Sequence, residues 1–99
     1  MATDLTLDQF RKSLRKNKPE PDWSHHVQAL WYAGKGDWDK AHEIVQDLPD
    51  PVASRIHAFL HRQEGDISNA KYWYAKAGIN MPDLTLDEEW NVLVDGLMC

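Results

Sequence analysis

The fold is decided by the stretch Leu30-Trp-Tyr-Ala-Gly-Lys-Gly-Asp-Trp-Asp-Lys-Ala41 and by its partial copy 29 positions later, Phe59-Leu-His-Arg-Gln-Glu-Gly-Asp-Ile-Ser-Asn-Ala70. In both copies a Gly-Asp pair separates two segments that lack strand-like alternation. Glycine commonly ends a helix because it adopts positive φ without strain, and aspartate is a good cap for the next helix. Each copy therefore predicts a helix, a tight turn and a second helix.

Signals on either side of the two copies predict flanking helices. Thr6 and Gln9 have the spacing of a capping box, and so do Thr85 and Glu88. In a capping box, the side chain of each residue accepts a hydrogen bond from the backbone N–H of the other. Leu5 and Phe10 add a hydrophobic staple at the first. We therefore expect an all-α single domain of about six antiparallel helices: an N-terminal capping helix in residues 1–18 that ends near residue 17, repeat one in 23–49, repeat two in 50–78, and a C-terminal capping helix in 84–99.

The turn Gly36-Asp-Trp-Asp-Lys-Ala41 is similar to the turn of a tetratricopeptide (TPR) repeat, and Ala29 and Ala58 fall where that family packs its two helices closely. The resemblance covers about residues 23–78. The period of 29 is shorter than the usual 34, and two copies are fewer than the usual three. The segments from Trp38 to His42 and from His57 to Gly78 also resemble a bacterial family of small helical proteins without an assigned activity.

The TPR resemblance implies a concave groove, lined by first-helix residues, that holds an extended peptide. Carried over position by position, it is lined by His26, Leu30 and Ala33 from copy one and by Arg55, Phe59 and Arg62 from copy two. Arg55 and Arg62 lie seven residues apart on one helix face and could hold a carboxylate or phosphate. The family's carboxylate clamp uses Lys and Asn at several of these positions, so this set departs from it. Alternatively, the two arginines form ordinary surface ion pairs with the acidic remainder of the chain.

Two histidines have the spacing of metal ligands on a helix, His57 and His61 at i and i+4, with Glu64 one turn further on. His25, His26 or His42 could approach them in the fold. The sequence favours packing instead, with both imidazoles against Tyr72 or Trp73, because no cysteine or second histidine pair completes a ligand set. We therefore predict no metal and no cofactor.

Catalytic patterns are weak. The serines do not stand in a Gly-x-Ser-x-Gly elbow, and no glycine-rich loop suits a phosphate. Glu88 and Glu89 are adjacent and are expected to be exposed residues that complement the helix dipole. The run Tyr72-Trp-Tyr74 spans too wide an arc for one core, so one ring should lie outside, along the surface or against a partner. We expect no enzyme.

Charge and cysteine content limit the partners. Residues 1–18 carry a net +3 and residues 19–99 a net −8, which disfavours nucleic acid and membrane surfaces as partners despite the basic segment Arg11–Lys18. The single cysteine, Cys99, and the lack of a signal peptide or long apolar run indicate the cytoplasm. The sequence predicts a non-catalytic protein-interaction module whose protein or peptide partner could be acidic. The alternatives are a metal-binding protein built on His57 and His61, and a structural protein that forms homo-oligomers.

Overall fold

Six α-helices form in the part of the chain that a computed structural model describes, residues 6–98, and this part contains no strand. The all-α prediction is therefore confirmed. In chain order the helices are α1 (Leu7–Ser13), α2 (His25–Gly34), α3 (Trp38–Val45), α4 (Pro51–Gln63), α5 (Ile67–Lys76) and α6 (Leu86–Met98).

The Gly-Asp pairs make the two turns that the repeat predicted. Gly36 and Gly65 have φ of 84° and 85°, and neither has an atom within 4 Å of the position where a Cβ would stand. The side chains of Asp37 and Asp66 then accept hydrogen bonds from backbone amides three residues on, which caps α3 and α5. Because a left-handed residue is followed at once by a cap, each pair reverses the chain within a few residues.

The other helix starts are also capped as expected. Both capping boxes form, at Thr6 and at Thr85, and Ser24 and Asp50 cap α2 and α4. The staple partner Leu5 lies outside the described residues. Helix α1 ends at Ser13, earlier than the prolines alone suggested, and Lys35 Nζ donates to the carbonyls of residues 14 and 16 at 2.7 and 3.0 Å.

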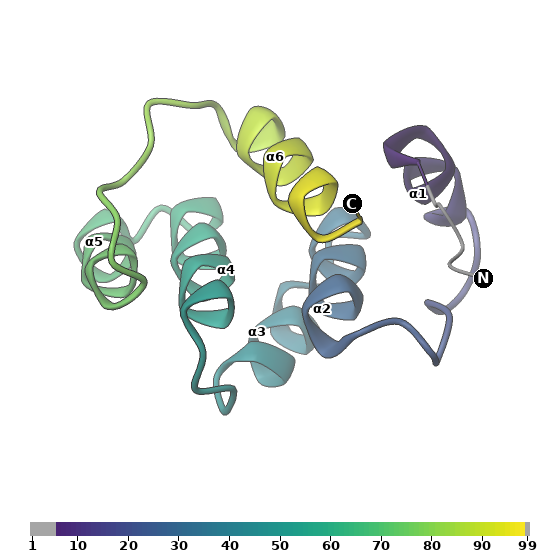
Figure 1. The fold of residues 1–99 in the computed structure, drawn as a ribbon, viewed down its shortest axis with the longest axis horizontal. Helices are drawn as coiled ribbons and strands as arrows, with labels where there is room; N and C mark the ends of the chain where they lie inside the picture. The colour runs from purple at the N-terminus through teal and green to yellow at the C-terminus, as the bar shows by residue number, and fades with distance from the viewer. Residues whose placement is uncertain (1–5, 99) are drawn as a thin grey trace.

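Two helical hairpins, α2–α3 and α4–α5, stand side by side, and α6 crosses them (Figure 1). Helix α6 packs on α2 and α4, and α1 packs on α6. The main core fills the space between these helices with fully buried side chains, the largest being Trp31, Phe10, Phe59, Leu30 and Ile56. The C-terminal helix therefore covers the inner face of both hairpins.

Gly34 has a role that its sequence position did not reveal. It is the last residue of α2 and not the turn residue, which is Gly36. A Cβ on Gly34 would lie 2.9 Å from Cζ2 of Trp90, whose Nε1 donates to the carbonyl of Leu30 at 2.9 Å. The missing side chain lets α6 approach α2 closely.

Candidate functional site

Helix α6 closes the face of α2 and α4 where the sequence predicted a peptide groove. Leu30, Phe59 and Ala33 are 0%, 1% and 5% exposed and belong to the main core. The groove is therefore not an open surface in this structure. As a ligand-binding surface it stays a prediction, and one that requires α6 to move.

Arg55 and Arg62 do hold a carboxylate, which belongs to the chain's own Glu89. Arg62 Nη1 donates to Glu89 Oε1 at 2.7 Å, and Arg55 Nε lies 3.5 Å from Oε2. Tyr74 Oη donates to Oε1 at 2.5 Å, and Arg62 Nη2 donates to the carbonyl of Leu84 at 2.7 Å. Both arginines are therefore in ion pairs, as the alternative predicted, but their carboxylate partner is buried and does not lie at the surface.

Glu89 corrects the prediction that it is exposed beside Glu88. Its exposed fraction is 0%, whereas Glu88 is exposed and caps α6 through the amide of Thr85. The apolar pattern of α6 includes Trp90, Leu93 and Val94, and position 89 lies at the edge of that stripe. Sequence reasoning missed the site because the partners of Glu89 come from α4 and α5, far away in the chain.

The aromatic run of α5 divides between core and surface as expected. Tyr74 is 1% exposed, Trp73 is half-buried, and Tyr72 is 57% exposed. Burial raises the pKa of Tyr74, and the hydrogen bond to Glu89 raises it further. The phenol therefore remains a hydrogen-bond donor to the buried carboxylate.

His26, the remaining residue of the predicted groove, pairs with a different carboxylate from Glu89. Its Nε2 is 2.8 Å from Oδ2 of Asp50, the cap of α4. Burial alone would raise the pKa of Asp50, but hydrogen bonds from His26 and from the amide of Ala53 lower it below its ordinary value. His26 thus ties the start of α2 to the start of α4.

Three other histidines meet between α3 and α4. His57 and His61 occupy successive turns of α4, and His42 approaches from α3 with its ring centroid 4.5 Å from that of His57 and 5.5 Å from that of His61. One ligand atom from each imidazole can be chosen so that all three lie within 4.8 Å of one another. His25 and His26 do not join this cluster.

Two tryptophans flank the three rings. The indole of Trp73 stacks on His57 with centroids 3.9 Å apart and an interplanar angle of 16°, and Trp38 stacks on His42 at 4.7 Å and 13°. Trp38 is itself anchored, because its Nε1 donates to the carbonyl of Leu60 at 2.6 Å. The predicted packing beside Trp73 is therefore found for His57. His61 instead lies near Trp38, with ring centroids 5.9 Å apart, and near His42, which adds a third imidazole.

Two imidazoles of the cluster, His57 and His42, are biased toward the neutral form. Burial, together with nearby His42 and His61, lowers the pKa of His57 to about 4. Burial and nearby His61 also lower the pKa of His42. The Nδ1 atom of His61 lies 2.7 Å from Oε2 of Glu64. A neutral imidazole keeps one nitrogen lone pair, so the lowered pKa values of His57 and His42 favour a lone pair over a charge on these two rings.

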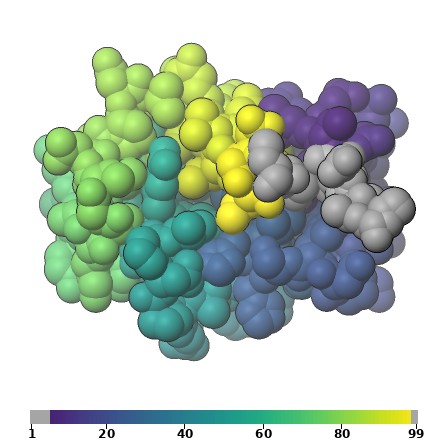
Figure 2. Space-filling model, in the orientation of Figure 1, coloured from purple at the N-terminus to yellow at the C-terminus, as the bar shows by residue number. Residues whose placement is uncertain are grey.

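An apolar groove runs beside Arg55 at the outer edge of α4 and α6. It has a volume of about 300 Å³ and is lined by Pro51, Val52, Arg55, Ala77, Ile79, Val92, Leu93, Gly96 and Leu97. Figure 2 shows the surfaces of α4 (teal), α6 (yellow) and the segment after α5 (green) meeting on one face of the molecule. Sequence reasoning included Arg55 but none of its apolar neighbours.

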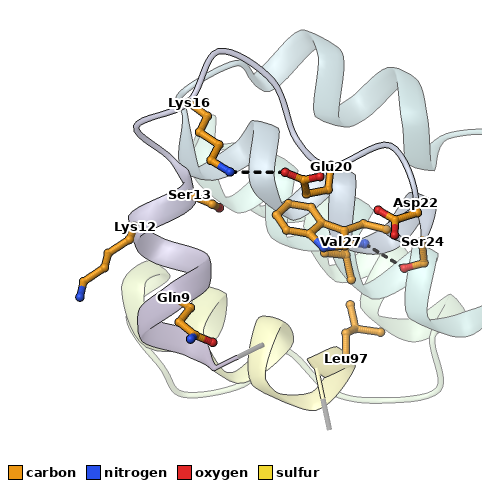
Figure 3. Close-up of a pocket in the computed structure, with 10 residues that line it drawn as sticks. Gln9, Lys12, Ser13, Lys16, Glu20, Asp22, Ser24, Val27 and Leu97 are labelled. Carbon is orange, nitrogen blue, oxygen red and sulfur yellow. Dashed lines mark hydrogen bonds and ion pairs between the residues drawn. The ribbon is translucent and has the colours of Figure 1, made fainter. Parts of the chain in front are cut away.

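A larger hollow, of about 710 Å³, lies between α1, the start of α2 and the end of α6 (Figure 3). Its rim is polar: Lys16 pairs with Glu20 at 3.4 Å, and Lys12 points away from the hollow and pairs with Asp8 at 3.3 Å. Arg11 instead reaches Asn91 of α6 at 2.8 Å. Three cations of the basic segment are thus engaged with side chains of the same chain.

Comparisons with protein families, with curated proteins and with solved structures find no match to this chain. Among the described helices, none has the length and apolar character needed to cross a membrane.

Proposed function

We propose that this chain is a non-catalytic protein-binding module that receives an apolar, acidic segment of a partner protein in the groove between α4 and α6. The proposal keeps the TPR-like interpretation of the repeats, a bacterial source and a cytoplasmic location. It moves the binding surface from the covered face of α2 and α4 to the groove between α4 and α6.

The observation that carries the proposal is where apolar side chains are exposed. Among the described residues, five large hydrophobic side chains are exposed, and three of them, Val52, Ile79 and Val92, line this one groove. Their exposed fractions are 40%, 38% and 47%. Single exposed apolar residues are ordinary on protein surfaces, so the gathering of three of the five in one groove is what favours this surface for a partner.

Arg55 determines the chemistry of the partner. Its side chain is 28% exposed at the groove wall, and within residues 6–98 its hydrogen bond to Glu89 uses Nε alone. The two Nη groups remain to donate to a carboxylate of a ligand. An apolar segment that carries an Asp, a Glu or a terminal carboxylate satisfies both the groove and the guanidinium.

Selection of displayed peptides on the untagged full-length chain, followed by binding titrations, tests this proposal. We expect enriched peptides to combine apolar residues with a carboxylate and to lose at least tenfold in affinity on Val92→Lys and on Arg55→Gln, where tenfold corresponds to about 1.4 kcal/mol. Ile67→Lys is the matched control, because Ile67 is 42% exposed on α5 and lies outside the groove.

Two results would count against the proposal. Peptides that bind Val92→Lys as tightly as they bind wild type would locate binding elsewhere. A concentration-dependent dimer in sedimentation experiments that Val92→Lys abolishes would instead make the groove an interface between copies of this chain, as in the structural alternative.

A further inference from the structure

The cluster of His42, His57 and His61 has features that packing alone does not require. Two of the rings, His57 and His61, are only 5% and 6% exposed, and imidazoles at such burial normally have hydrogen-bond partners. Within residues 6–98, a side-chain hydrogen bond is found for His61, to Glu64, and none for the ring nitrogens of His42 or His57. The ring nitrogens of His42 and His57 keep contact with solvent, because no buried side-chain nitrogen or oxygen of the described residues lacks a hydrogen-bond partner. They are therefore available to bind a ligand.

We propose that His42, His57 and His61 together bind one divalent transition-metal ion, with Zn²⁺ as the reference ion. This site is independent of the groove between α4 and α6. Three imidazoles are the protein ligands of a well-known type of zinc site, in which water or another ligand takes the fourth position. The nitrogen-only donor set also suits Cu²⁺ and Ni²⁺, and it is a poor set for Mg²⁺ and Ca²⁺, which prefer oxygen ligands.

The distances are within reach of coordination. Nitrogens around a tetrahedral zinc lie about 2.0 Å from the metal, which places them roughly 3.3 Å from one another. The ligand atoms of the three histidines lie within 4.8 Å of one another before any metal is added. Small rotations of the rings would close the difference. His57 and His61 start from the same helix face, so the backbone has already brought two ligands together.

Glu64 is a positioning residue for this site. A hydrogen bond between His61 Nδ1 and the Glu64 carboxylate, 2.7 Å long, requires the proton on Nδ1 and leaves the lone pair on Nε2. Metal-bound histidines commonly donate their other N–H to a carboxylate in this way, which fixes the tautomer and the ring orientation. The Trp38 and Trp73 indoles fix the planes of the other two rings by stacking.

The test uses the full-length chain without a histidine tag, stripped of metal with a chelator. Zn²⁺ is titrated in calorimetry, and Co²⁺ is titrated by its visible absorption, which is intense for tetrahedral sites. We expect one equivalent per chain with a Kd of about 1 μM or tighter. In nitrogen-detected spectra, the ring nitrogens of His42, His57 and His61 should shift on Zn²⁺ addition, while those of His25 and His26 should not.

Variants separate coordination from packing. His57→Phe keeps a flat ring against Trp73 but removes the nitrogens, and it should abolish stoichiometric binding. His25→Gln, an exposed histidine outside the cluster, is the matched control and should bind as wild type does. Glu64→Gln should weaken Zn²⁺ binding by roughly 10- to 100-fold and change the tautomer signal of His61. A purely structural role for Glu64 would leave the metal affinity unchanged.

The proposal fails if the wild type takes up less than a tenth of an equivalent of Zn²⁺ or Co²⁺ at micromolar concentration. It also fails if His57→Phe binds with the affinity of the wild type. Should His57→Phe not fold, His42→Gln replaces it, because His42 is only partly buried. The ring-nitrogen spectra of the wild type decide the matter without any variant.

Discussion

Replacing Glu89 by glutamine tests whether the buried carboxylate holds α6 against α4 and α5. The substitution Glu89→Gln preserves the shape of the side chain and removes its charge. Arg62, whose side chain is 14% exposed, then loses its carboxylate partner, and Arg55 loses a weaker contact at 3.5 Å. Tyr74 can still donate to the amide oxygen of the new side chain, so its hydrogen bond is largely retained.

The expected loss in the free energy of unfolding depends on the charge of Arg62, which stays mostly buried without its partner. Breaking a buried ion pair by removing one partner typically costs 3–5 kcal/mol, because the other charge is left uncompensated. Arg62 keeps its bond to the carbonyl of Leu84 and some contact with water, which places the loss at the lower end, about 3 kcal/mol. A domain of this size is stable by about 5–15 kcal/mol, so the loss is a large part of the total.

Urea denaturation followed by circular dichroism and tryptophan fluorescence measures the effect. In a separate thermal melt, we expect the midpoint temperature of Glu89→Gln to fall by roughly 12–24 °C. Asp87→Asn, an exposed acid in the same first turn of α6, should change the stability by no more than about 0.5 kcal/mol. Removing both charges in Arg62→Met with Glu89→Leu should recover part of the loss. A change below about 1 kcal/mol for Glu89→Gln would refute the reasoning, since buried pairs normally cost 3–5 when broken.

Three further predictions concern the glycines and the histidine cluster. Gly36→Ala should destabilise the fold by about 1–2 kcal/mol in the same urea experiment, because a φ of 84° strains any residue with a Cβ. Gly96→Ala is the control: it has open space around it on α6 and should be neutral or stabilising. Gly34→Ala should destabilise by about 1 kcal/mol and alter the near-ultraviolet dichroism, because the new methyl group meets the rigid indole of Trp90 at 2.9 Å; an unchanged midpoint would mean that α6 yields easily. In metal-free protein, the pKa of His57 is about 4 in the folded state and 6.5 in the unfolded state. The unfolded state therefore takes up the proton first, and the free energy of unfolding falls by up to about 3 kcal/mol as the pH is lowered from 6.5 to 4. His57→Phe should flatten this slope in denaturation curves at several pH values.

Local signals were sufficient for the elements of the fold. The turns at Gly36 and Gly65 and both capping boxes depend on residues within four positions of one another, so their chemistry can be read directly from the chain. The repeat then predicted two hairpins, because the same local pattern occurs twice. The same reasoning placed the end of α1 too late. After Ser13 the backbone bonds are of the i→i+3 kind, and Lys35, far along the chain, donates to two carbonyls of this segment.

The candidate sites depended on contacts between distant residues. The i and i+4 spacing of His57 and His61 was evident in the sequence, but the third imidazole, His42, comes from another helix, and only packing of α3 on α4 brings it near. Arg55 and Arg62 meet a carboxylate of the chain itself, and their binding of a ligand carboxylate stays a prediction. The sequence could not show that Glu89, 27 positions after Arg62, would supply it.

The sequence by itself therefore determined the helices, their turns and the duplication, because those features follow from short-range backbone chemistry. Only the tertiary structure decided which face remained open. Helix α6 lies across α2 and α4, buries Glu89 completely and covers the face that the repeats would otherwise present. The physical reason is that burial depends on what packs against a residue, and for both the arginine pair and the histidine cluster that neighbour lies on another helix.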